Sequence, residues 1–186
     1  MTPIEFITDY IKRWEGGLSL DRADTGNFVN GILIGSKYGV TAPALAKHRG
    51  VSAASITAAQ MAALTIEEAA AIGKALYYDA PGFAKLPWNR VTMSIVDFGW
   101  GAGPVQAIKL MQRMVGAADD GVIGPRTVAA YATWLEADKA AAWAARRDIF
   151  YDQIIARTPS NAKFEKGWKS RTAYFLPSSE WWGRAA

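Results

Sequence analysis

The chain has 186 residues, of which 51% are hydrophobic and 20% charged, so it can bury a core and lacks the composition of a disordered segment. It has no cysteine and one histidine, His48, which excludes disulfides, thiolate or multi-histidine metal sites and a cysteine nucleophile. The net charge of +4 arises after Glu136, which suits a polyanionic partner, but the balanced charge before Glu136 gives no basic stripe for nucleic acid. We expect no metal and no cofactor.

The first predicted helix begins at Thr2-Pro3-Ile4-Glu5, where threonine can cap, proline suits the first turn and glutamate completes a capping box. Apolar residues recur at helical spacing from Ile4 to Trp14. Glu15 lies four residues after Ile11, at the edge of that apolar face, and Gly16-Gly17 end the helix.

Two effects disfavour the ionised form of a carboxyl group in this position. Desolvation against the apolar face raises its pKa, and the negative end of the helix dipole raises it again. A general acid needs a raised pKa to hold its proton near neutral pH. The periodicity alone also allows a surface glutamate that merely ends a helix.

Residues 18–38 have no helical period and alternate turn residues with short apolar runs, which predicts a small β-hairpin or irregular β-lobe. The pattern from Thr41 to Tyr78 is helical and alanine-rich, and Thr65-Ile66-Glu67-Glu68 predicts another capping box.

The second half of the chain is helical throughout. A buried helix is predicted from Arg90 to Trp100, and Pro104 starts the next. Further helices are predicted at residues 124–135, 138–157 and 163–175, with a tail at 177–186 that docks on the body. We expect a mainly α, α+β lysozyme-like fold with a helical body and a small β-hairpin lobe after the first helix. Two lobes, residues 1–89 and 90–186, would form one compact unit.

Two ordered series of motifs resemble known families. The series Glu15-Gly16-Gly17, Asp21, Asp24, Gly26 and Lys37–Thr41 resembles that of glycoside hydrolase family 108. The series Asp97–Pro104, Met111–Arg113, Asp120–Thr127 and Phe164–Arg171 resembles the peptidoglycan-binding segment that accompanies this family.

The resemblance implies an N-acetylmuramidase, or lysozyme, of the kind found as phage endolysins. Such an enzyme hydrolyses the β-1,4 bond between N-acetylmuramic acid and N-acetylglucosamine in bacterial peptidoglycan. The catalytic acid carries over onto Glu15, and the aspartate nine residues later onto Asp24. Whether the outcome is retaining or inverting depends on the separation of the two carboxylates.

The sequence departs from the family pattern after Gly26. Asn27 stands in place of a glycine, and extra, largely apolar residues follow within Phe28–Gly35. These could lengthen the hairpin, alter the roof of the cleft or touch a membrane surface. Ser36 stands in the place of the family's threonine, so Ser36 and Thr41 both qualify as the third catalytic partner.

Five residues are candidates for substrate binding. Tyr38, Trp88 and Trp100 can form platforms against sugar rings, although packing in the core is an equally good reason for the tryptophans. Asp97 can bond a sugar, although a structural bond within a buried helix is favoured. Gln112 can reach the cleft from its helix.

Two other functions stay open: a lytic transglycosylase that uses the same acid, and a non-catalytic peptidoglycan-binding module. No apolar run reaches the roughly 18 residues of a membrane span, and the N-terminus lacks the pattern of a signal peptide. We expect a monomer without stable membrane insertion. It would stay in the cytoplasm of the producing cell until it is released to the periplasm or cell wall.

Overall fold

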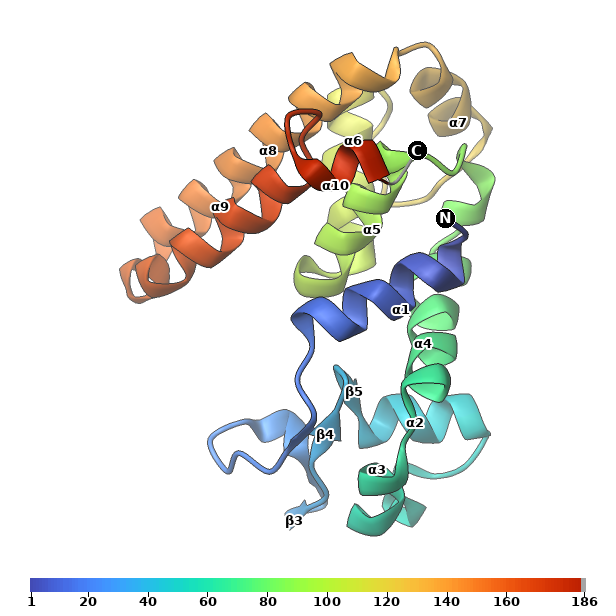
Figure 1. Cartoon of the computed structure of the whole chain (residues 1–186), viewed down its shortest axis with the longest axis vertical. Helices are drawn as coiled ribbons and strands as arrows, with labels where there is room; N and C mark the ends of the chain where they lie inside the picture. The colour runs from blue at the N-terminus through green and yellow to red at the C-terminus, as the bar shows by residue number, and fades with distance from the viewer. Residues whose placement is uncertain (185–186) are drawn as a thin grey trace. The chain divides into compact units, whose positions relative to one another are not determined.

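The computed structural model describes residues 1–184, and the side chains of all of these except Ala137 and Arg184 (Figure 1). The chain forms two compact units: Thr2–Leu76, and Met1 together with the chain from Tyr77 onward. Residues 77–89, which the sequence places with the first lobe, belong to the second unit. A π-helical stretch, Ala75–Asp79, carries the chain from one unit into the next.

The first unit opens with α1 (Pro3–Trp14), and the predicted capping box is confirmed. The Thr2 N–H donates to the Glu5 carboxylate at 2.7 Å, and the Glu5 N–H donates to the Thr2 hydroxyl at 3.4 Å. The buried face of α1, which packs on α4 (Ile66–Lys74), consists of Phe6, Ile7, Tyr10 and Ile11. The predicted apolar row lies on this helix and is buried at its centre, while Ile4 and Trp14 at its two ends are 38% and 36% exposed.

The β-lobe consists of five two-residue strands: β1 (Leu18–Ser19), β2 (Phe28–Val29), β3 (Ile32–Leu33), β4 (Ser36–Lys37) and β5 (Val40–Thr41). Strands β1, β4 and β5 form an antiparallel sheet in that order, while β2 and β3 form a hairpin of their own after the 3₁₀ turn Thr25–Asn27. The turns Asn30-Gly31 and Tyr38-Gly39 both have positive φ at both positions, as tight two-residue hairpins require. The predicted β-rich lobe is confirmed, and the extra residues Phe28–Gly35 contain the separate hairpin.

Four helical segments complete the first unit: α2 (Ala42–Arg49), a 3₁₀ turn (Ala53–Ser55), α3 (Ala58–Ala63) and α4. Thr65 caps α4 by accepting from the Glu68 N–H at 3.2 Å. The predicted capping box is only half formed. The Glu68 carboxylate instead accepts two hydrogen bonds from Arg49, at 2.9 and 3.0 Å, which ties α2 to α4.

The second unit is helical: 3₁₀ turn Phe83–Lys85, α5 (Arg90–Ala102), α6 (Pro104–Val115), α7 (Pro125–Ala132), α8 (Glu136–Arg157), 3₁₀ turn Pro159–Phe164, α9 (Glu165–Tyr174) and α10 (Glu180–Arg184). Its centre is α5, in which every residue from Val91 to Gly99 is buried, and α5 packs against α6 and α8. Helices α8 and α9 run side by side (Figure 1). The tail docks through Trp181, which is buried against Phe175; its last two residues lie outside the described part.

Candidate active site

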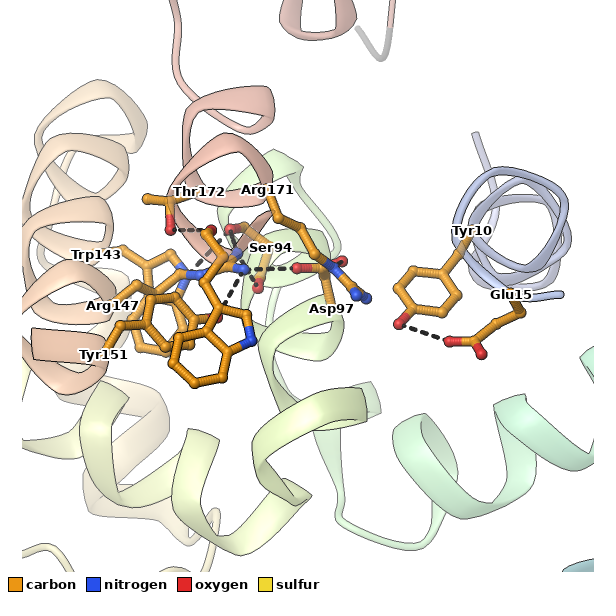
Figure 2. Close-up of polar contacts among 10 residues, drawn as sticks. Tyr10, Glu15, Ser94, Asp97, Trp143, Arg147, Tyr151, Arg171 and Thr172 are labelled. Atoms are coloured by element: carbon orange, nitrogen blue, oxygen red, sulfur yellow. Dashed lines mark hydrogen bonds and ion pairs between the residues drawn. The ribbon is translucent and has the colours of Figure 1, made fainter. Parts of the chain in front are cut away.

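Glu15 is the first residue after α1. Its N–H donates to the carbonyl of Ile11 at 3.0 Å, so its side chain continues the row of Ile7 and Ile11. The side chain is half-buried, and the Tyr10 hydroxyl donates to its Oε1 at 3.2 Å (Figure 2). Among residues 1–183, whose side chains are described except that of Ala137, Glu15 forms no ion pair. Burial raises the pKa of the Glu15 carboxyl because desolvation disfavours the charged form, as predicted.

Backbone contacts hold the segment after Glu15 along the β-lobe. The Gly16 carbonyl accepts from the Tyr38 N–H at 3.0 Å, and Leu18 pairs with Lys37 across β1 and β4. A Cβ on Gly16 or Gly17 would meet no atom within 4 Å. Close packing therefore does not require glycine at these positions, and the backbone beside Glu15 has open space next to it.

Asp24 lies in the turn that precedes η1 (Thr25–Asn27). It is exposed, and its Oδ1 accepts from the Gly26 N–H at 2.8 Å, which caps the turn. Asp21 makes a similar turn contact, with Oδ1 accepting from the Ala23 N–H at 2.9 Å. Both aspartates thus have a local structural role, and a catalytic role for Asp24 stays a prediction.

The structure places the two candidates for the third partner side by side, and Gly26 lies between Thr41 and Asp24. Ser36 and Thr41 are directly opposite each other on β4 and β5, so their side chains lie on one face of the sheet. A Cβ on Gly26 would lie 3.1 Å from Asp24 Oδ1 and 3.8 Å from Thr41 Cγ2. Because Gly26 has no side chain, nothing from that residue separates Asp24 from Thr41. Both hydroxyls therefore remain candidates.

Tyr38 occupies the first position of the β4–β5 turn. Its φ of 54° lies in the left-handed region, which a tyrosine seldom adopts. Its ring is half-buried, with the Lys37 ammonium 5.1 Å from the ring centre. Because its N–H bonds the Gly16 carbonyl, Tyr38 is tied to the residue that follows Glu15.

Asp97 lies in a buried ion-pair cluster in the second unit (Figure 2). Its Oδ2 is 2.8 Å from Arg147 Nη2, and its Oδ1 is 2.8 Å from Arg171 Nε. Arg147 Nη1 and the Trp143 indole N–H each donate to the Ser94 hydroxyl at 3.0 Å. The favoured structural role of Asp97 is therefore present, but its partners are two arginines from α8 and α9 and not groups within its own helix.

The two tryptophans make packing contacts within the second unit. The Trp88 indole N–H donates to the Met1 carbonyl at 2.9 Å, and its ring meets Tyr78 edge-on at 5.1 Å. Trp100 stacks on Tyr77 with ring centres 4.4 Å apart. Both rings are packed on one side and are only half-buried, so a role in substrate binding stays a prediction.

The sequence predicts that Gln112 can reach the cleft from its helix, but the side chain is enclosed by the protein. It is fully buried, and its Nε2 lies 2.8 Å from Asp120 Oδ1, 3.0 Å from the Val122 carbonyl and 3.1 Å from Thr127 Oγ1. Its Oε1 accepts from the Gly121 N–H at 2.9 Å. The amide therefore holds the loop between α6 and α7 in place, and this loop covers it from solvent.

Tyr10, which contacts Glu15, was not predicted from the sequence, and neither were the polar partners Ser94, Arg147 and Arg171 of the Asp97 cluster. Arg147 lies on one helical row with Trp143 and Tyr151, at spacings of four residues. A cation on an aromatic row, together with an acid in an otherwise apolar helix, is the signal that could have paired Arg147 with Asp97. Tyr10 lies on the apolar face of the helix that ends at Glu15, which is a weaker signal.

Two further kinds of site were sought in the described chain. Among residues 1–184, no group of three or more histidine, cysteine, aspartate or glutamate side chains is placed to hold a metal ion. No helix in the same range is long and apolar enough to cross a membrane.

A helix ending in a desolvated glutamate, a small antiparallel β-lobe and a helical body define an α+β protein of the lysozyme-like class. Residues 8–103 match the model of the family Glycosyl hydrolase 108, and the chain belongs to this family. Residues 106–173 match a second model, described as Predicted Peptidoglycan domain. The structure of Brucella abortus SagA is similar, with 25% sequence identity and a TM-score of 0.71, over 92% of this chain and 90% of that chain. No curated protein sequence matches the chain significantly.

The two family matches do not coincide with the two compact units. The first match ends at residue 103, after α5, whereas the first unit ends at Leu76. Helix α5 packs on α6 and α8, which lie in the second match. The second unit is therefore built from parts of both matches.

Proposed function

We propose that the chain is an N-acetylmuramidase that hydrolyses the β-1,4 bond between N-acetylmuramic acid and N-acetylglucosamine in bacterial peptidoglycan. Family membership supports a glycoside hydrolase, and the match over residues 106–173 supports peptidoglycan as the partner. The assignment of Glu15 as the general acid is carried by one observation: its carboxyl is desolvated without an ion-pair partner among residues 1–183, which raises its pKa.

In the proposed reaction, Glu15 donates its proton to the glycosidic oxygen as the bond from that oxygen to the anomeric carbon breaks. The Tyr10 hydroxyl, at 3.2 Å from Oε1, orients the carboxyl group. Positive charge develops on the sugar ring, and Asp24 either stabilises that charge or orients the water that attacks the anomeric carbon. The attacking water gives its proton to the deprotonated Glu15 in the first case and to Asp24 in the second. The hydroxyl of Ser36 or Thr41 assists Asp24 from the face of the sheet that the two residues share.

The glycan strand approaches this site over the open backbone at Gly16-Gly17. Tyr38 offers the half-buried ring against which one sugar face packs. Of the five predicted substrate contacts, Tyr38 is the one that the proposal retains. Trp88, Trp100, Asp97 and Gln112 are engaged within the second unit as described above.

The test is product analysis of purified peptidoglycan digested by the wild type, Glu15→Gln and Glu67→Gln. Glu67 is an exposed glutamate on α4 and serves as the matched control. We expect the wild type and Glu67→Gln to release fragments with reducing N-acetylmuramic acid ends, and Glu15→Gln to release almost none.

Three results would contradict the proposal. Full activity of Glu15→Gln would remove Glu15 from the catalytic role. Fragments that carry anhydro-muramic ends in place of reducing ends would make the chain a lytic transglycosylase. Co-sedimentation with peptidoglycan without any soluble fragment would make it a non-catalytic binding module.

A further inference from the structure

A cavity of about 260 Å³ lies within the second unit, between α5, α8 and α9. Its polar lining comes from Asp97, Arg147 and Arg171, and its apolar lining includes Tyr151, Ile154 and Trp168. The proposed catalytic residues are not among those that line it.

The charged residues that line the cavity carry more positive than negative charge. One carboxylate, Asp97, stands between two guanidinium groups, at 2.8 Å from each. Burial opposes the charge of Arg147, but the neighbouring Asp97 and Tyr151 raise its pKa overall. Burial lowers the pKa of Arg171 to about 10, which still leaves it charged at neutral pH.

Arg147 also has a donor that the protein does not use. Its Nε is buried and has no hydrogen-bond partner in the described chain, although Nη1 and Nη2 bond to Ser94 and Asp97. A buried donor without a partner costs stability. The nearest further acid along the chain is Asp148, the residue after Arg147, and it does not line the cavity. An anion inside the cavity would balance the excess charge.

The rest of the lining is largely apolar. Tyr151 and Trp168 stack with ring centres 5.0 Å apart, and Ile154 also lines the cavity. Gly101 and Ala102 form part of the lining from α5. Pockets for drug-sized ligands span roughly 300–1,000 Å³, so this cavity suits one or two small residues better than a disaccharide.

We propose that this cavity binds the carboxylate of a small apolar acid, and that its ligand in peptidoglycan is the alanine end of a stem peptide. The inference rests on the proposed function, because it takes peptidoglycan as the partner. The terminal carboxylate lies against Arg171 and Arg147, and the alanine methyl groups lie against Tyr151, Ile154 and Trp168. The lactyl carboxylate of muramic acid has related chemistry, but in the intact wall it is consumed in the amide bond to the stem peptide.

Calorimetric titration of the full chain tests this directly. The probes are N-acetyl-D-alanyl-D-alanine, its C-terminal amide and free N-acetylmuramic acid. We expect saturable binding of the dipeptide acid and none of the amide. Equal binding of acid and amide would overturn the role of the arginines, and binding of N-acetylmuramic acid alone would overturn the peptide assignment.

Variants then locate the binding. Arg171→Gln should lower the affinity for the dipeptide by about tenfold or more, because a charge-assisted hydrogen bond is lost. Arg146→Gln, an exposed neighbour of Arg147, should bind like the wild type. Gly101→Leu gives a second test that leaves both arginines intact. A Cβ there meets no atom within 4 Å, so the variant should fold and obstruct the cavity. Wild-type affinity in both Arg171→Gln and Gly101→Leu would overturn the proposal.

The same variants separate this inference from the proposed catalysis. Glu15→Gln should lose glycan hydrolysis and still bind the dipeptide, while Gly101→Leu should still hydrolyse glycan strands stripped of peptide. If the wild type hydrolyses glycan but never binds the dipeptide, only the cavity assignment fails. If it binds the dipeptide and Glu15→Gln remains fully active, only the catalytic assignment fails.

Discussion

Glu15 and Asp97 are both carboxylates next to apolar helix surfaces, but they differ in burial and in their charged partners. Asp97 is completely buried and lies 2.8 Å from each of two guanidinium groups. Glu15 is half-buried, and its described partner is one tyrosine hydroxyl at 3.2 Å. The first carboxylate is held as an ion, and the second has a pKa raised by desolvation.

The difference shows that burial alone does not decide what an acidic side chain does. Removal from water disfavours the charged form of both groups. Two cations compensate for this at Asp97, which makes it a fixed structural charge. Because Glu15 has no such cation among residues 1–183, it can hold a proton and release it during a reaction.

Loss of activity in Glu15→Gln is the largest expected effect. Positioned general acids accelerate reactions by about 10²–10⁴-fold, so the rate of glycan cleavage should fall by that order. The free energy of unfolding should stay the same or rise, because glutamine removes a carboxylate that is unfavourable when ionised. Cleavage rates and urea unfolding of the same preparations measure both. If Glu15→Gln were unfolded, Glu15 would have a structural role like that of Asp97, and the proposed difference between the two carboxylates would be wrong.

Asp97→Asn, unlike Glu15→Gln, should lower the free energy of unfolding. Removing one partner of a buried ion pair typically costs about 3–5 kcal/mol, because it leaves the other charge buried without compensation. Arg147, which is fully buried, would be that charge. Urea unfolding of Asp97→Asn and of the control Asp119→Asn measures the effect. Asp119 is exposed in a surface ion pair with Arg113, so its variant should differ little from the wild type. Equal stabilities for the two variants would contradict this account.

Features governed by neighbouring residues could be predicted from the sequence. The starts of α1, α6 and α7 at Pro3, Pro104 and Pro125 agree with the predictions, because a cap or a proline acts within one helical turn. The desolvation of Glu15 was predictable for the same reason: its position relative to Ile11 depends on helix geometry alone.

Features governed by distant segments could not be predicted. Asp97 and Arg147 are 50 residues apart, and although the aromatic row on α8 marks Arg147 as inward-facing, nothing local indicates which helix it faces. The predicted reach of Gln112 failed because the loop around Gly121 folds over it, and no rule of periodicity predicts that loop. The rotation of α1 that exposes Trp14 depends in the same way on where α4 packs.

Tyr10→Phe should have a smaller effect than either carboxylate variant. The Tyr10 hydroxyl donates to Glu15, and a donor stabilises the ionised carboxylate relative to the protonated one. Its removal should therefore raise the pKa of Glu15 further. Since a general acid works while protonated, the alkaline limb of the pH–rate profile should move to higher pH. Tyr38→Phe, which leaves Glu15 unchanged, provides the comparison. A limb that stays in place or moves to lower pH would remove Tyr10 from the site.

The pH dependence of stability offers the finest comparison of the two carboxylates. The pKa of Glu15 is higher in the folded chain than its usual value of 4.5. The stabilisation linked to that shift is therefore fully present below pH 4.5 and is lost as the pH rises through the folded-state pKa. Glu15→Gln cannot ionise and therefore does not lose this stabilisation. The free energy of unfolding of the variant, relative to that of the wild type, should rise as the pH passes through this interval. The rise should be smaller than the loss of stability caused by Asp97→Asn. Urea unfolding of both proteins from pH 4 to 8 measures the difference. If the two curves stay parallel throughout, the carboxyl of Glu15 titrates as an ordinary surface group and is not poised as an acid.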